Sequence, residues 1–131
     1  MKQTYSFTYY WNAQQDEKGR FTAFFDGYKS GDPLQIAYRG LVEVTAVNLF
    51  RDSLQLAIAE ALFSLFNGPD RWPVDYRGPS MSVGSVLEIQ GSFFAVASVG
   101  FESVDIWGSP ICPGDRRWYS GPSIQTVSLL R

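Results

Sequence analysis

The spacing of apolar residues along the chain changes once, from a strand-like to a helical pattern. Two early segments, 3–11 and 20–29, are rich in aromatic residues and threonine, which favours strands, and a polar loop ending at Gly19 separates them. A third extended segment, 34–46, follows a Ser-Gly-Asp-Pro turn, and Gly40 within it indicates a bulge or a bend. This part of the chain is therefore predicted to consist of strands.

From Asp52 onwards the pattern becomes helical. Apolar residues recur three and four positions apart as far as Phe66, which is typical of an amphipathic helix. Asp52 suits the N-cap position with Gln55 as its capping-box partner, and Asn67-Gly68-Pro69 suits a left-handed C-cap. The apolar positions are Leu54, Ala57, Ile58, Ala61, Leu62, Leu65 and Phe66. One main helix is therefore predicted.

The C-terminal half returns to alternation of apolar and polar residues. Short alternating segments near 85–90, 92–98 and 101–107 predict three strands. Gln90-Gly91 stands between the first two, at the two-residue position of a type I′ turn, where glycine supplies the positive φ. These features predict an antiparallel hairpin followed by a further strand.

The order of the elements predicts the fold class. Residues 108–123 show no regular pattern, and 124–130 fits a last strand that closes the sheet. We expect a single α+β domain over residues 1–131, with one main amphipathic helix packed on a curled, mostly antiparallel sheet. Glycines at the strand ends indicate sharp turns and a half-barrel in the C-terminal half. The pattern leaves open whether the N-terminal strands share the C-terminal sheet.

Composition supports a folded chain with a substantial core. Of the 131 residues, 45% are hydrophobic and 16% aromatic, which is enough to bury a core in one domain. The N-terminus lacks the apolar segment of a signal peptide, and no segment has the length of a membrane-spanning helix. We expect a soluble, cytoplasmic protein without a membrane partner. The formal net charge of −2 provides no long-range attraction for nucleic acid.

The sequence contains no histidine and one cysteine, Cys112. An internal disulfide and the usual ligand sets for zinc, copper and haem are therefore excluded, as are histidine-dependent catalytic triads. Cys112 also has no histidine to activate its thiol. We expect no metal, no cofactor and no enzymatic activity. One enzymatic alternative stays open, a metal-dependent hydrolase that uses the loop carboxylates Asp70, Asp75 and Asp115.

The segment from Ser80 to Val86 is rich in small residues. Such a segment can expose backbone N–H groups to an anion, but a phosphate-binding loop ends in Gly-Lys-Ser/Thr before a helix, and no lysine follows Lys29. We interpret the segment as a fold-defining turn, while ligand binding there stays open. The residues with this structural role, in the turn and the strands after it, are Ser80, Ser82, Val83, Gly84, Gly91, Gly100 and Phe101.

Three segments in the second half of the chain form a recognisable set: Phe66-Asn67, the segment from Ser80 to Val86, and Ser98-Val99-Gly100-Phe101. Through these segments, residues 66–104 resemble the YodL-like group, small accessory proteins of plasmids and integrative mobile elements. Ser85 stands where an aspartate is usual in the group, and Ala97 where a cysteine is frequent. If that aspartate takes part in chemistry in the group, this chain lacks it; if it only stabilises a turn, Ser85 can replace it. The resemblance implies a plasmid, a phage or a conjugative element as the setting.

Two loops, 70–78 and 115–121, place arginines beside tryptophan and tyrosine. Loops often carry binding residues, and arginine and aromatic residues are enriched at the centres of protein interfaces. Alternatively, the rings stack on single-stranded nucleic acid, or they cover the edge of the core with the arginines extended over them. The candidate binding residues are Arg71, Trp72, Tyr76, Arg77, Arg116, Arg117, Trp118 and Tyr119.

These observations favour an interaction protein over an enzyme. We expect a non-enzymatic accessory protein of a mobile element or phage, such as an inhibitor or modulator of a host factor, that binds a protein partner through the two arginine loops. A homodimer stays open. The alternative is a module that binds single-stranded nucleic acid or a nucleotide through the same loops. The hydrolase with loop carboxylates is a third interpretation.

Overall fold

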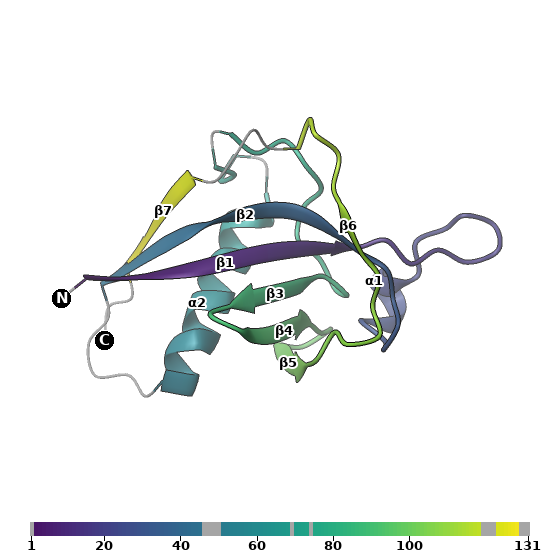
Figure 1. Ribbon diagram of the computed structural model, residues 1–131, viewed down its shortest axis with the longest axis horizontal. Helices are drawn as coiled ribbons and strands as arrows, with labels where there is room; N and C mark the ends of the chain where they lie inside the picture. Colours follow the sequence, from purple (N-terminus) through teal and green to yellow (C-terminus); the bar gives the residue numbers. More distant parts are fainter. Residues whose placement is uncertain (1, 46–50, 69, 74, 119–122, 129–131) are drawn as a thin grey trace.

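The computed structural model describes residues 2–45, 51–68, 70–73, 75–118 and 123–128. It is an α+β domain in which the main helix packs on a curled sheet, as the sequence predicts (Figure 1). The elements are β1 (Lys2–Asn12), α1 (Ala23–Asp26), β2 (Leu34–Thr45), α2 (Arg51–Phe66), β3 (Val86–Ile89), β4 (Ser92–Val96), β5 (Phe101–Val104), β6 (Ile111–Pro113) and β7 (Ser123–Ser128).

The strands form one sheet in the order β5-β4-β3-β1-β2-β6, and β7 also pairs with β2. The pairs β1–β2, β1–β3, β3–β4 and β4–β5 are antiparallel, whereas β6 and β7 run parallel to β2. Strand β1 lies between β2 and β3 and so joins the two halves of the chain in a single sheet. This arrangement answers the question that the sequence leaves open.

A β-bulge bends the long β1–β2 ribbon. The register shifts between Tyr9, which pairs with Tyr38, and Tyr10, which pairs with Ile36, so Ala37 is the extra residue on β2. Gly40 instead pairs regularly with Phe7. The predicted bulge therefore occurs in β2, three residues before the predicted glycine.

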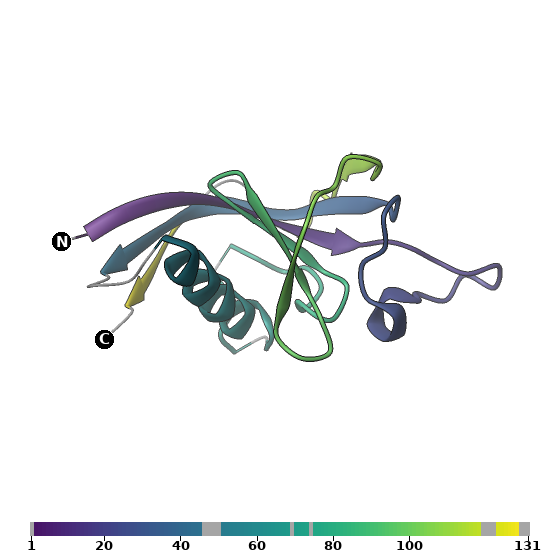
Figure 2. The ribbon, with the colours of Figure 1, turned by 90° about the horizontal axis from the view of Figure 1, so that it is seen from below.

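The main core lies between α2 and one face of the sheet (Figure 2). Ile58 and Leu62 of α2 are fully buried there, as the helical spacing predicts. Five aromatic rings meet beneath the C-terminal end of the helix, with centroid distances of 5.1 to 6.2 Å along the contacts of Phe66. These rings belong to Phe7, Tyr9, Tyr38, Phe66 and Tyr76. A smaller cluster on the opposite face contains Tyr10, Leu34, Val86 and Ala95.

The predicted strand at 20–29 is wrong, because this segment contains the single turn of α1. Gly27, at φ 74°, ends that turn, and its N–H donates to the Ala23 carbonyl at 2.9 Å. Aromatic residues favour strands when they pack on a half-buried surface. Here Phe25 is 90% exposed, so its ring gains nothing from a sheet.

Both predicted caps of α2 are also wrong. The helix includes Arg51, so Asp52 lies inside it, and buried Gln55 donates to the Ile89 carbonyl at 3.4 Å. At the C-terminal end neither Asn67 nor Gly68 has a positive φ; Pro69 lies outside the described residues. Distant donors satisfy the carbonyl of Phe66, the last residue of the helix, which is another way to complete a helix end.

Two groups share the carbonyl of Phe66 at that end. The Met81 N–H donates to it at 3.0 Å, and Trp72 Nε1–H donates at 3.1 Å. The Asn67 side chain in turn donates to the Met81 carbonyl at 2.9 Å. The predicted irregular segment 108–123 likewise contains regular structure, since β6 within it pairs with the start of β2.

Candidate interaction surfaces

The small-residue segment 80–86 is a turn that is held from three sides. The Gly84 N–H donates to the Val96 carbonyl at 2.9 Å, and the Gly84 carbonyl accepts from Asn12 Nδ2 at 3.1 Å. Gly84 has a φ of 91°, and a Cβ at this position would collide with the Ala23 side chain and lie 3.0 Å from its carbonyl oxygen. Glycine is required here by conformation and by space. These contacts support the interpretation of the segment as a fold-defining turn.

Two of the serines in this segment stabilise the turn by hydrogen bonds, and the next turn has the predicted backbone conformation. The Ser85 N–H donates to the Ser82 carbonyl at 3.0 Å, and the Ser82 N–H donates to Ser85 Oγ at 3.2 Å. Ser85 is buried and closes the turn by these two bonds. Gln90 and Gly91 both have positive φ, 50° and 84°, as the predicted type I′ turn requires.

A buried polar pair fixes the same end of the molecule. Asn12 and Asp32 are 4% and 8% exposed, and Asn12 Nδ2 donates to Asp32 Oδ2 at 3.0 Å. Asp32 Oδ2 also accepts from the Lys29 N–H at 2.9 Å, and Asn12 Oδ1 accepts from the Gln14 N–H at 3.0 Å. The pair therefore joins β1, the loop after α1 and the Gly84 turn.

The aromatic residues of the first arginine loop belong to the core. Tyr76 is buried, and its hydroxyl donates to the Pro79 carbonyl at 2.5 Å; the Tyr9 hydroxyl donates to the same carbonyl at 3.1 Å. Burial raises the pKa of both tyrosine hydroxyls above the ordinary value. The Trp72 ring packs edge-on against Tyr76 at 5.1 Å. Tyr76 is therefore part of the core, and half-buried Trp72 packs against it.

The second loop is anchored in a similar way. The Trp118 ring packs edge-on against Trp11 at 6.1 Å, and the Trp118 N–H donates to the Asp115 carbonyl at 3.0 Å. A Cβ added at Gly114 would collide with this indole and with the Ile36 carbonyl, so the chain passes close beneath the ring. Tyr119 lies outside the described residues. The described aromatic residues of the two loops, Trp72, Tyr76 and Trp118, thus pack against or within the core rather than standing free for bases to stack on.

The structure joins the two loops. The Arg77 N–H donates to the Trp118 carbonyl at 2.6 Å, and both loops lie along the same edge of the molecule (Figure 1). The four arginines of the two loops are exposed. We call Arg71, Arg77, Arg116 and Arg117 the arginine surface.

Nearby polar groups hold two of these arginines and one carboxylate of the first loop. Arg117 pairs with Asp115 at 2.6 Å, and this guanidinium lowers the pKa of the Asp115 carboxyl to about 2. Arg71 Nη1 donates to Ser64 Oγ at 2.8 Å, at the end of α2. Asp75 accepts from the Tyr38 hydroxyl at 2.9 Å, so this carboxylate is directed towards the core.

The residues of the hydrolase interpretation do not form a metal cluster. Within the described part of the chain, no three His, Cys, Asp or Glu side chains come close enough to hold an ion. Asp115 is engaged by Arg117, and Asp75 by Tyr38. Cys112 is exposed on β6, where it pairs with Gln35 of β2.

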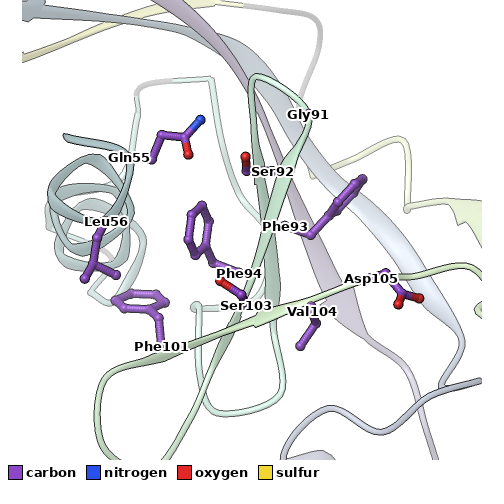
Figure 3. A pocket seen from close by; sticks show the side chains of 10 residues that line it. All are labelled: Gln55, Leu56, Gly91, Ser92, Phe93, Phe94, Phe101, Ser103, Val104 and Asp105. Carbon is purple, nitrogen blue, oxygen red and sulfur yellow. The ribbon is translucent and has the colours of Figure 1, made fainter. Parts of the chain in front are cut away.

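A groove that the sequence does not predict lies beside the sheet edge at β5. This groove has a volume of about 690 Å³ and runs between the first half of α2 and the strands β4 and β5 (Figure 3). Leu56, Phe94 and Phe101 face the space between the helix and the strands. The signals in the sequence are Leu56 and Phe63, two apolar residues of α2 that lie outside the helical stripe.

Comparison with known proteins gives no match, whether with protein-family models, with curated proteins or with solved structures. The resemblance of residues 66–104 to the YodL-like group therefore stays a prediction. Among the described residues, no helix is long and apolar enough to cross a membrane.

Proposed function

We propose that the protein is a non-enzymatic interaction protein whose arginine surface binds an acidic face of a partner protein. The observation that supports this most directly is the bond from Arg77 to Trp118, which holds together two loops that are distant in sequence and that each carry exposed arginines. A guanidinium can bind a carboxylate through two parallel hydrogen bonds. Such contacts are frequent at the centres of protein interfaces.

A protein partner fits this surface better than single-stranded nucleic acid. A binder of single strands needs exposed rings for the bases as well as cations for the phosphates. The described rings of the two loops, Trp72, Tyr76 and Trp118, pack against other residues of the core instead. In line with the resemblance to the YodL-like group, we further propose a host factor as the partner and the cytoplasm of a cell that carries a mobile element as the setting.

Two variants with the same change in charge test the proposal. In the first, the four residues of the arginine surface become alanine; in the second, the exposed cations Lys18, Arg20, Lys29 and Arg39 do. Tagged wild-type protein and both variants are incubated with host lysate at 300 mM salt, and the captured proteins are quantified by mass spectrometry. We expect one acidic protein to be captured by the wild type and by the second variant, and at least tenfold less by the first.

A labelled thymidine 20-mer serves as the nucleic-acid probe in the same comparison. If the protein binds the 20-mer with an affinity that falls steeply with salt and depends on the arginine surface, the partner is a polyanion and not a protein. Equal capture by the two charge-matched variants would show that the arginine surface is not the binding site.

A further inference from the structure

Strand β5 provides an open edge for strand pairing. It ends the sheet order and pairs only with β4 among the described residues. Val96, which pairs with Phe101, donates its N–H to the Ser85 carbonyl at 2.9 Å and so faces away from β5. Because backbone groups alternate along an antiparallel pair, Phe101 and Ser103 direct their N–H and C=O groups outwards. These groups are a template for one more strand.

An apolar strip lies beside this edge. Phe101 packs edge-on against Phe63 of α2 at 6.2 Å, so the helix forms the wall of the groove on that side. Leu56 is 39% exposed within the groove, and Phe94 lines it from β4. An added strand would place every second side chain over this strip, because side chains alternate between the faces of a strand.

The surroundings of the groove are acidic. Asp105 lines it, and Glu60 lies four residues after Leu56, on the same face of α2. Glu102 is exposed on the other face of β5. The sequence has no lysine or arginine between Arg77 and Arg116, so no cation from this segment neutralises these carboxylates. The groove is therefore complementary to a cationic segment.

We propose that this groove binds an extended, basic segment of a partner protein, which pairs as an additional strand with β5. Its apolar side chains lie over Leu56, Phe94 and Phe101, and its lysines or arginines lie near Glu102 and Asp105. A second copy of this chain would instead bring its own acidic β5 against these carboxylates. The proposal does not depend on the arginine surface, which lies in other loops.

The test uses capped synthetic heptapeptides as probes. In the first, lysine alternates with valine, leucine and valine; in the second, glutamate replaces lysine. The third keeps the lysines but carries an N-methyl group on each apolar residue, because in an antiparallel pairing with β5 the apolar residues are those whose N–H groups face β5. Binding is followed by fluorescence anisotropy and by NMR of the ¹⁵N-labelled protein. We expect affinity in the micromolar range for the first peptide, and at least tenfold weaker binding for the other two.

Matched variants locate the site. Leu56 and Leu41 are both 39% exposed, but Leu41 lies on β2, far from the groove along the sheet order. Leu56→Arg should weaken binding of the lysine peptide at least tenfold, whereas Leu41→Arg should leave it unchanged. Ser103→Pro removes an outward N–H and not a bond to β4, and should also abolish binding. If Ser103→Pro does not fold, the comparison of Leu56→Arg with Leu41→Arg and the binding of the N-methylated peptide test the proposal without it.

The NMR spectra and sedimentation distinguish the other occupants. We expect shifts confined to residues 101–105 and the facing side of α2, with slowed amide exchange at Phe101 and Ser103. Equal binding of the lysine, glutamate and N-methylated peptides would overturn the proposal. A dimer that Ser103→Pro dissociates would also overturn it, because a second copy would then occupy the edge.

Discussion

The buried pair of Asn12 and Asp32 allows a sharp test of the packing at one end of the sheet. The amide of Asn12 donates two hydrogen bonds, to Asp32 Oδ2 at 3.0 Å and to the Gly84 carbonyl at 3.1 Å. Asn12→Asp changes the shape of the side chain little but replaces both donors by an acceptor. The variant therefore places two carboxylates 3.0 Å apart, away from water.

The expected cost has one part that depends on pH and one that does not. At an effective dielectric constant of about 20, two charges about 3 Å apart repel by roughly 5–6 kcal/mol. Proton uptake limits this cost: an aspartate in an unfolded chain titrates near pH ~3.9, so holding one proton at pH 7 costs about 4 kcal/mol. The Gly84 carbonyl also loses its donor, which adds about 1–3 kcal/mol.

The sign of the pH dependence follows from the proton that the folded variant binds. One carboxyl of the pair is protonated in the folded protein but ionised in the unfolded chain, so acid stabilises the folded state. We expect a loss of about 5–7 kcal/mol relative to the wild type at pH 7, and the loss should shrink by about 1.4 kcal/mol for each pH unit down to pH 5. Urea unfolding of both proteins at pH 5, 6 and 7 measures the difference.

Asn67→Asp is the matched control. Asn67 is exposed and donates one hydrogen bond, to the Met81 carbonyl at 2.9 Å. The same chemical change there should cost about 1 kcal/mol, without the steep dependence on pH. If Asn12→Asp is unfolded at pH 7, its refolding as the pH falls from 7 to 5 reports the same uptake of one proton by the folded state. A loss below about 1 kcal/mol that does not vary with pH would show that the pair is not a buried contact.

Two further predictions concern the turn and the arginine surface. Gly84 and Gly91 both have positive φ, but only at Gly84 would a Cβ collide with Ala23. Gly84→Ala should therefore destabilise by about 2–5 kcal/mol in urea unfolding and Gly91→Ala by about 1–2 kcal/mol, and equal losses would remove the steric argument. Arg117→Ala should raise the pKa of Asp115 from about 2 towards the usual value for aspartate, as measured by NMR titration of its carboxyl carbon, whereas an unchanged pKa would show that the pair does not form.

The sequence predicts best those elements whose contacts are local. The turn between β3 and β4 depends on Gln90 and Gly91 alone, and both adopt the predicted positive φ. The middle of α2 follows from its spacing, because Ile58 and Leu62 need one common apolar surface. Strand β6 escapes prediction, since its three residues gain regular structure only by pairing with the distant start of β2.

The end of α2 shows why caps are harder to predict than helices. Asn67-Gly68 has the composition of a left-handed cap, yet the Phe66 carbonyl is satisfied by Met81 and Trp72. Met81 lies fifteen residues and Trp72 six residues further along the chain. A local motif is therefore dispensable where the fold brings other donors to the same carbonyl.

The candidate sites divide in the same way. Tryptophan and arginine in one loop indicate a binding surface, but the sequence cannot separate rings that pack inwards from rings that face solvent. In the structure Trp118 packs against Trp11, and Trp72 packs against Tyr76. Both contacts are with residues that the local sequence does not indicate as partners. The groove at β5 depends on the approach of Leu56 to Phe101, which are 45 residues apart, so no local pattern indicates it.

The total charge of −2 does not describe the charges close to either proposed site. The arginine surface draws its cations from two loops that lie on either side of a segment without lysine or arginine, and that segment supplies Glu102 and Asp105 beside the β5 groove. Charges more than about 10 Å apart are largely screened from each other at physiological salt. A partner therefore experiences the local charge of the face that it approaches and not the total. For this reason the near-neutral total charge is compatible with both proposals, an acidic protein face at the arginine surface and a basic strand at β5.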